Sequence, residues 1–435
     1  MKQKKEYLLK GGRVVLQSGI EKLNLVIRDG IIAELGQDLR SEGSVIDLSH
    51  RTILPGFIDI HHHGANGFDF TFGNYDAEQD QFKVEEENFA EGLDGSLSFT
   101  LSTGTTGLLL TTMAAPLDDL ITSLKLLRDC DKVPLVDKMV IGVNLEGTFL
   151  KDPAFAGAQN PAFFQTPSLD LVRKLQRMSG DQIRIINIPP DHGEHALEII
   201  KQLVEDGVVI AGGHTGAYGD TFRLAVDAGL SLGVHFLNGP SRHSAKGFHG
   251  GGAEEAMLQS DQVSLEIIAD GYHVHPAYFL DVLARKGADR VVVITDSMFA
   301  SGCTGISKFS LIGLTGQVSP DGRYLTMLGK EDTLFGSVLT MEQAFRNVVR
   351  WLTTGGPGNW HRMHQAYSFD SALILASQLC STNAARLVGC FETVDNMPGR
   401  GDIQTGKRAD LVICSGDSAE ELKVDSVFLA GELVS

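Results

Sequence analysis

The feature that most constrains this chain is an apolar run that ends in a histidine cluster. Residues 52–58 have the β-branched and aromatic character of a buried strand, and Asp59, His61 and His63 follow before a glycine. Because residues two apart on a strand point the same way, the imidazoles of His61 and His63 face one point. Such a pair suits a borderline divalent cation such as zinc. The alternative is a fortuitous or tag-like cluster, but a tag does not lie inside an apolar strand.

The composition limits the class of protein. A chain of 435 residues is long enough for a barrel-sized domain and a smaller one. Its 37 Lys and Arg against 55 Asp and Glu give a formal net charge of −18, which argues against nucleic acid or an anionic membrane as partner. We find neither a signal peptide nor an apolar run of about 18 residues, and we expect a cytoplasmic protein. The 5 cysteines form no Cys-x-x-Cys pair, so thiolate zinc ligands are not expected.

Both ends of the chain carry short strand patterns. Residues 1–52 contain alternating stretches joined at turns such as Asp29-Gly30, a strong hairpin signal. Residues 396–435 have the same character. Neither end has enough strands to close a core alone. We therefore expect the two ends to pair into one small β-sandwich domain beside the main domain.

Between these ends, over residues 53–395, apolar strand patterns alternate with helical ones. The predicted strands are 53–60, 106–112, 139–145, 183–188, 207–213, 231–236, 264–269 and 290–295. Helices are indicated after Pro116, before Gly207, and from a capping sequence at Thr340 through Trp351. Eight such strands match an α/β fold, the (β/α)8 or TIM-like barrel, whose active sites lie at the carboxyl ends of the strands.

Residues that ligate metals follow five of these strands. They are His61 and His63 after the first, Glu146 after the third, His214 after the fifth, His235 at the end of the sixth and Asp296 after the eighth. Each alone has an ordinary explanation, as a buried histidine bonded to the backbone or an acid that caps the next helix. Together they would converge on one mouth of the barrel, and this favours a metal site.

The connection over residues 65–105 is unusually long and rich in acids. At the catalytic face of a barrel it predicts a flap or helix over the mouth, while an acidic, solvated surface helix explains the pattern equally well.

Several motifs resemble the amidohydrolase superfamily and, within it, the N-acetylglucosamine-6-phosphate deacetylase family. The superfamily pattern is matched by PGFIDIHHHG at residues 55–64. The deacetylase motifs are matched at residues 145–150, 213–215, 235–238, 268–274, 295–296, 334–341, 381–386 and 401–412. The resemblance therefore extends over nearly the whole chain.

This resemblance implies a set of roles. Glu146, His214 and His235 would bind the main metal, and His61 and His63 would help hold a second ion bridged by Glu146. One or two divalent ions are implied, zinc first, with iron or another divalent metal as the alternative. Asp296, also near the metal, would act as general acid and base towards the attacking water and the leaving amine. His273 would contact the sugar or the phosphate.

The chain departs from the family pattern on the substrate side. Asn144 stands where the family has histidine. Gln159 replaces a family histidine that polarises the carbonyl, and glutamine donates a hydrogen bond without carrying charge. Asn238-Gly239 replaces the family's Asn-Ala, whose backbone helps to hold phosphate. The phosphate-binding arginine, often supplied by a neighbouring subunit, corresponds to Lys246, with Arg242 as the rival.

The function implied is removal of the acetyl group from N-acetylglucosamine 6-phosphate, which gives glucosamine 6-phosphate and acetate, by a homodimer. A second hypothesis is hydrolysis of another N-acyl amino sugar or amide. A third is a binding relative without turnover, against which Asp296 argues, since a binder needs no acid beside a metal.

Overall fold

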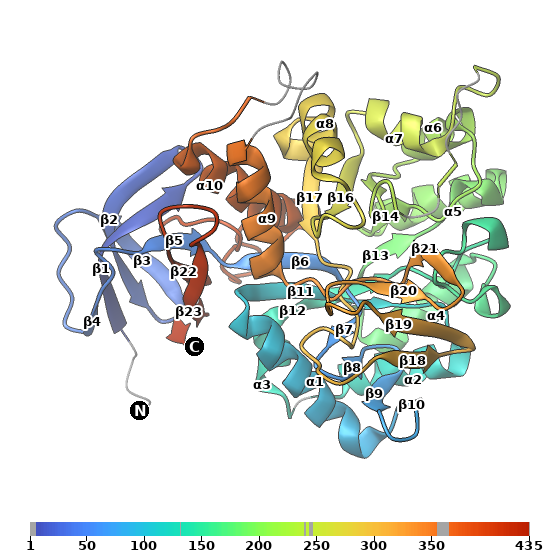
Figure 1. Ribbon diagram of the computed structural model, residues 1–435, viewed down its shortest axis with the longest axis horizontal. Coiled ribbons are helices and arrows are strands. Elements are labelled where there is room, and N and C mark those ends of the chain that lie inside the picture. Colours follow the sequence, from blue (N-terminus) through green and yellow to red (C-terminus); the bar gives the residue numbers. More distant parts are fainter. Residues whose placement is uncertain (1–5, 131, 239–240, 243–246, 355–364, 435) are drawn as a thin grey trace.

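The computed structural model describes residues 6–130, 132–238, 241–242, 247–354 and 365–434 (Figure 1). Its central element is a parallel sheet of eight strands in the order β17-β16-β15-β14-β13-β12-β11-β6. These strands are β6 (Phe57–His62), β11 (Thr105–Thr112), β12 (Val140–Leu145), β13 (Ile183–Asn187), β14 (Val209–Gly212), β15 (Leu232–Gly233), β16 (Ser264–Ile268) and β17 (Val291–Ile294). The backbone N–H of Asp296 donates to the carbonyl of His61, 2.9 Å away, which brings the last strand to the first. The predicted barrel is confirmed.

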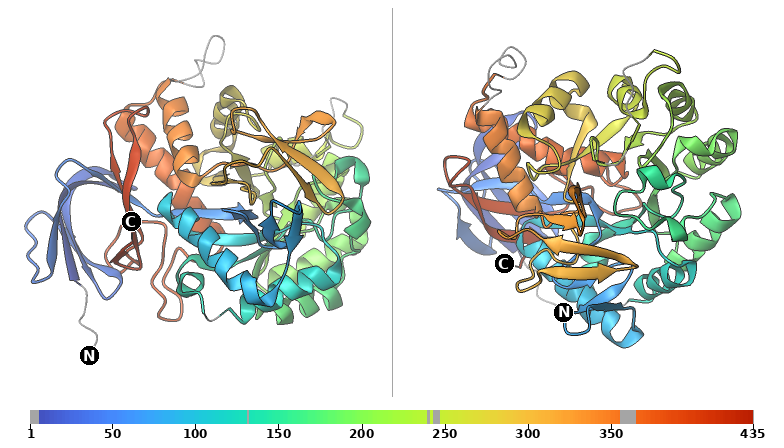
Figure 2. Two further views of the ribbon diagram at one scale, coloured as in Figure 1. Left: turned by 60° about the horizontal axis from the view of Figure 1, so that its bottom comes forward. Right: turned by 45° about the vertical axis from the view of Figure 1, so that its right-hand side comes forward.

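Helices cover the outside of the barrel (Figure 2, green and yellow). The helices are α1 (Glu86–Ser102), α2 (Leu117–Arg128), α3 (Pro134–Met139), α4 (Leu169–Ser179), α5 (Glu194–Glu205), α6 (Gly219–Asp227), α7 (Ala253–Gln259), α8 (Pro276–Lys286), α9 (Met341–Thr354), α10 (Phe369–Ser377) and α11 (Asn383–Leu387). As predicted, α2 follows Pro116 and α5 ends before Gly207. The Thr340 hydroxyl caps α9, since it accepts from the N–H of Gln343 at 3.3 Å. Burial on both faces explains why β17 is wholly apolar.

The first predicted strand, 53–60, is wrong as a single element. It is divided between β5 (Thr52–Pro55), which belongs to a different sheet, and β6 of the barrel. Pro55 has no N–H to continue a ladder, and Gly56 bonds instead to the carbonyl of Asp410. A Cβ at Gly56 would lie 2.1 Å from the Thr106 hydroxyl, so only glycine allows the chain to pass this closely between the two sheets.

Both chain ends share that second sheet, as predicted (Figure 1, blue and red). Its order is β24-β23-β22-β5-β1-β2-β3, with β4 paired to β1. The remaining strands are β1 (Glu6–Leu16), β2 (Gly19–Arg28), β3 (Ile31–Gly36), β4 (Ser44–Asp47), β22 (Leu411–Ser415), β23 (Lys423–Leu429) and β24 (Glu432–Leu433). The sheet has an apolar core of its own, around Leu25, Ile53 and Phe428. The domain boundaries at 52/53 and 395/396 stay predictions.

Two small antiparallel sheets follow the first and last barrel strands. One is β7 (Gly64–Ala65), β8 (Phe68–Asp69), β9 (Gly73–Asp76) and β10 (Gln81–Lys83), and the other is β18 (Lys308–Leu311), β19 (Leu314–Val318), β20 (Leu325–Met327) and β21 (Lys330–Leu334). Neither sheet was predicted. The two meet where Asp80 accepts from the backbone N–H and hydroxyl of Ser310 at 2.7 Å. In the long connection, α1 exposes acids at its start and buries Phe89 and Leu93, which matches the surface-helix alternative.

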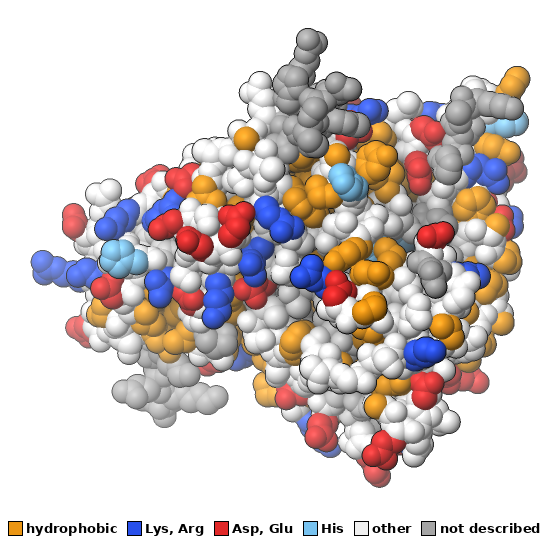
Figure 3. Space-filling model, viewed as in Figure 1, with side chains coloured by type: hydrophobic (Ala, Val, Ile, Leu, Met, Phe, Trp, Pro, Cys, Tyr) orange, Lys and Arg blue, Asp and Glu red, His pale blue; other side chains and the backbone are white. Residues whose placement is uncertain are grey.

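One face of the molecule shows how its charged side chains are distributed. On the face in Figure 3, acidic and basic side chains are interspersed over the terminal sheet and the barrel. Within the described residues, every helix is too short or too polar to cross a membrane.

Candidate metal centre

The predicted metal ligands meet at the carboxyl ends of the barrel strands. All of them except His61 line a cavity of about 660 Å³. His61 belongs to β6 and His63 follows it, Glu146 follows β12, and His214, His235 and Asp296 each lie two residues beyond β14, β15 and β17. All six side chains are buried. His214 and Asp296 adopt left-handed backbone conformations, with φ of 50° and 51°, which turn them from their strands.

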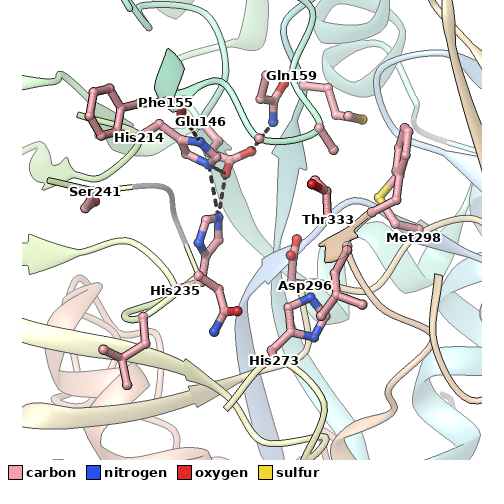
Figure 4. Close-up of a pocket in the computed structure, with 18 of the residues that line it drawn as sticks. Glu146, Phe155, Gln159, His214, His235, Ser241, His273, Asp296, Met298 and Thr333 are labelled. Atoms are coloured by element: carbon pink, nitrogen blue, oxygen red, sulfur yellow. Dashed lines mark hydrogen bonds and ion pairs between the residues drawn. The ribbon is translucent and has the colours of Figure 1, made fainter. Parts of the chain in front are cut away.

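Glu146 is the centre of this cluster (Figure 4). One carboxylate oxygen, Oε1, lies 2.9 Å from Nε2 of His235 and 3.1 Å from Nε2 of His214. The other, Oε2, accepts from the side-chain amide of Gln159 at 2.6 Å. The opposite ring nitrogen of His214 donates to the carbonyl of Phe155 at 3.0 Å, which directs Nε2 of His214 at Glu146. Three possible metal-binding atoms, Oε1 of Glu146 and Nε2 of His214 and His235, are thus held close together.

A second group lies beside the first. Nε2 of His63 is 3.2 Å from Oδ1 of Asp296, and Nε2 of His61 is 3.6 Å from both Asp296 and Glu146. Two groups of residues each offer three possible ligand atoms that lie within 4.8 Å of one another. One group is His61, His63 and Asp296, and the other is His61, Glu146 and His235. Nε2 of His61 is buried and has no hydrogen-bond partner within the described part of the chain. A buried imidazole nitrogen between two carboxylates fits a divalent cation.

The charges of this cluster also favour a cation. Burial by itself lowers the pKa of His61, but the carboxylates of Glu266, Glu146 and Asp296 outweigh it and raise that pKa to about 10. Burial raises the pKa of Asp296, but the hydrogen bond with His63 and nearby histidine charges outweigh burial and lower it to about 2. The pKa of Glu146 is likewise held well below its usual range by surrounding histidines, against the effect of burial. The surroundings that favour a proton on His61 also favour a metal ion beside it.

Three acids near this cluster were not assigned a role from the sequence. Asp59 binds the backbone N–H and hydroxyl of Thr295 at 3.2 and 2.5 Å, so it ties β6 to the segment that carries Asp296. Asp69 is fully buried and accepts from backbone N–H groups of residues 71 and 72. Glu266 is also fully buried and contacts His61. A charged residue within an apolar strand, as in residues 264–268, is the signal that could have identified Glu266.

The predicted substrate-side residues that are described line the same cavity. They are Gln159, Asn238, Arg242 and His273. Their neighbours fix three of them. Oε1 of Gln159 accepts from the N–H of Ala114 at 2.7 Å, and His273 pairs with Asp270 at 2.6 Å. The guanidinium of Arg242 lies 4.6 Å from the ring centre of Tyr218, and its Nε donates to the carbonyl of Gly216.

The cavity is also lined by residues that were not predicted from the sequence. Thr333 and Asp332 of β21 reach the cavity from the sheet β18–β21. The side-chain amide nitrogen of Asn238 is buried and has no hydrogen-bond partner among the described residues, so it is available to a ligand. Gly239 and Lys246 lie outside the described residues.

Known proteins are similar to this chain in sequence and in architecture. Residues 52–434 match the sequence model of the Amidohydrolase family. An N-acetylglucosamine-6-phosphate deacetylase of Lysinibacillus sphaericus is 31% identical over 334 residues, which are 75% of this chain and 79% of the relative. An N-acetylgalactosamine-6-phosphate deacetylase of Escherichia coli O157:H7 is 29% identical over 444 residues, 99% of each chain. The crystal structure of N-acetyl-D-glucosamine-6-phosphate deacetylase from Mycobacterium smegmatis aligns with a TM-score of 0.80 at 27% identity, covering 99% of this chain and 100% of that one.

Proposed function

The chain belongs to the amidohydrolase family, as a hydrolase of amide bonds, and from this premise we propose that it deacetylates N-acetylglucosamine 6-phosphate. The products would be glucosamine 6-phosphate and acetate. One observation carries the proposal: a buried carboxylate, Asp296, lies 3.2 Å from a candidate metal ligand, His63, inside a cavity of about 660 Å³. A protein that only bound the sugar would not need this acid.

The ligand residues suit one or two divalent ions. Glu146, His214 and His235 would hold the main ion, while His61, His63 and Asp296 would hold a second one beside Glu146. Imidazole and carboxylate donors are those preferred by zinc, and they also accept iron. When bound, the metal makes water a stronger acid and polarises the acetyl carbonyl.

Asp296 would carry both proton transfers. Its low pKa keeps the carboxylate ionised at neutral pH, so it can accept a proton from the attacking water. It would then donate that proton to the departing amine nitrogen. A single carboxylate on a fixed strand end can serve both steps, and no covalent acyl-enzyme is required.

Gln159 would orient the acetyl group. One N–H of its amide binds Glu146, and its oxygen is held by Ala114, so the direction of the amide is fixed. The second N–H would donate to the acetyl carbonyl as a neutral substitute for a histidine.

The phosphate and the sugar ring would bind to other residues that line the cavity. Arg242, Asn238, Gly239 and Lys246 are the proposed phosphate residues, and His273 is the proposed sugar contact. In a chain with a net charge of −18, local donors of this kind must supply the attraction for an anionic substrate. We also propose a cytoplasmic homodimer, as the sequence predicts.

A second candidate substrate is N-acetylgalactosamine 6-phosphate, the C4 epimer. The observation that favours it is the 29% identity, over 99% of both chains, to a deacetylase with that specificity. The same metal centre would serve either sugar, because the acetamide does not involve C4.

Acetate release distinguishes these substrates. The metal-loaded protein would be assayed with N-acetylglucosamine 6-phosphate, N-acetylgalactosamine 6-phosphate and unphosphorylated N-acetylglucosamine. We expect kcat/KM to be at least about 100-fold higher for one of the phosphorylated sugars than for the unphosphorylated one, since charged hydrogen bonds contribute about 1.5–3 kcal/mol each. Absence of acetate from all three, with metal bound, would refute the proposal.

A further inference from the structure

Glu266 is a buried acid whose position needs an explanation. It lies in β16 between Leu265 and Ile267, and its side chain is 0% exposed. Removing a carboxylate from water costs several kcal/mol unless it finds partners. The mechanism proposed above does not use Glu266.

The contacts of Glu266 determine which nitrogen of His61 carries the hydrogen. Oε2 of Glu266 accepts from the backbone N–H of His235 at 3.0 Å, and the same oxygen lies 3.0 Å from Nδ1 of His61. Because this oxygen acts as an acceptor, Nδ1 of His61 must be the donor. In the neutral ring that a metal ligand requires, the lone pair is then on Nε2 of His61, which has no hydrogen-bond partner among the described residues and lies 3.6 Å from both Asp296 and Glu146.

We propose that Glu266 is a positioning residue that holds His61 ready to bind the second cation, together with His63 and Asp296. This inference rests on the metal role proposed above for His61. Hydrogen bonds from the outer nitrogen of a ligand histidine to a carboxylate fix the ring and strengthen metal binding. Two divalent ions bring four positive charges, and the carboxylates of Glu146 and Asp296 offset only two of them. The carboxylate of Glu266 would offset a third.

The other candidate ligand histidines lack such a partner. The outer nitrogen of His214 binds a backbone carbonyl, and the Nδ1 atoms of His63 and His235 have no hydrogen-bond partner in the described part of the chain. Asp69 is a buried acid whose pKa is raised by burial and lowered by the charge of His63. No hydrogen bond or ion pair joins these two described residues. Asp69 is therefore a matched control: a buried carboxylate near a ligand histidine that does not orient its ring.

Zinc titration tests this role. Full-length wild type, Glu266→Ala, Glu266→Gln and Asp69→Asn would be freed of metal and titrated with zinc, with ions per chain measured by mass spectrometry and affinities by calorimetry. We expect wild type to bind two ions. In Glu266→Ala the second ion should bind about 10–100-fold more weakly while the first is retained. Glu266→Gln keeps an oxygen that can accept from both donors, so its loss should be smaller, and Asp69→Asn should change the second affinity less than about threefold.

The outcomes separate this inference from the proposed function. Two ions with equal affinities in wild type and Glu266→Ala would overturn the positioning role but leave the deacetylase proposal intact, and a single ion in wild type would do the same. Equal loss of both ions, accompanied by a lower Tm of the metal-free variant, would identify Glu266 as merely structural. Failure of wild type to bind zinc and to release acetate would instead refute the proposed function itself.

Discussion

The cavity has two parts that are built differently. We call the part with the candidate metal ligands the metal wall and the part with the proposed substrate-binding residues the substrate wall. On the metal wall, His63 and Glu146 directly follow barrel strands and are 3% and 2% exposed. On the substrate wall, Thr333 lies in an inserted sheet (Figure 4), Arg242 lies in a loop, and Tyr272 is 42% exposed. Strand ends are held by the packed barrel core, whereas loops tolerate change. The metal wall should therefore determine the reaction and the substrate wall the choice of sugar phosphate.

The largest expected effect lies on the metal wall. Asp296→Asn should lower kcat by about 10³-fold, because general acid and base catalysis contributes about 10²–10⁴-fold. KM should change little. Steady-state kinetics together with zinc analysis would check this, and the variant should retain the ion held by Glu146. Substantial turnover by the variant would show that another group moves the proton.

The next effect concerns the contribution of Asp69, near the metal wall, to the stability of the fold. Burial raises the pKa of Asp69 to about 6, against the charge of His63 and two backbone N–H groups. A folded pKa above the unfolded value means that the folded state binds the extra proton. Its contribution to stability is full below about pH 4 and is lost as the pH rises through about 6.

Metal-free wild type should therefore lose up to about 3 kcal/mol of unfolding free energy over this range through Asp69. Asp69→Asn should not show that loss, so the difference between the two proteins should grow from pH 4 to 6. Denaturant unfolding at several pH values measures it. A pH-independent difference would mean that Asp69 is ionised throughout.

Gln159 lies where the two walls meet, and its effect should be intermediate. Gln159→Ala should lower kcat/KM by about 10–100-fold, since Oε2 of Glu146 loses its amide donor and the N–H of Ala114 loses its acceptor. Gln159→His should retain activity but add a pH dependence from the imidazole. An unchanged kcat/KM in the alanine variant would remove Gln159 from the proposed site.

The smallest effect should come from the substrate wall. Arg242→Ala should raise KM for the phosphorylated sugar by about 10-fold and leave kcat within about threefold, because one charged hydrogen-bond donor is lost. The unphosphorylated sugar should be unaffected. Arg173→Ala is the control, since Arg173 is exposed on α4 and lies outside the cavity lining. A large loss of kcat in Arg242→Ala would break the distinction between the walls.

Much of the barrel and the metal cluster could be predicted from local patterns. Parallel strands buried on both faces are continuous apolar runs, so all eight could be located, although the first was merged with β5, and the candidate ligands lie at or just after the ends of such runs. The break at Gly56 and the sheet β18–β21 were missed. Apolar character does not reveal which sheet a strand joins, and short hairpins in a long connection resemble a loop.

By itself, the sequence predicted the barrel, the sheet made from both chain ends and the candidate metal ligands, because each depends on the order of residues along one segment. Only the tertiary structure decided which groups surround those ligands. His61 and Glu266 are 205 positions apart, and Asp59 and Thr295 are 236 apart. Their contacts form when the barrel closes and brings its first strand against the last two. Such pairs are set by three-dimensional packing, which no periodicity within a single strand or helix encodes.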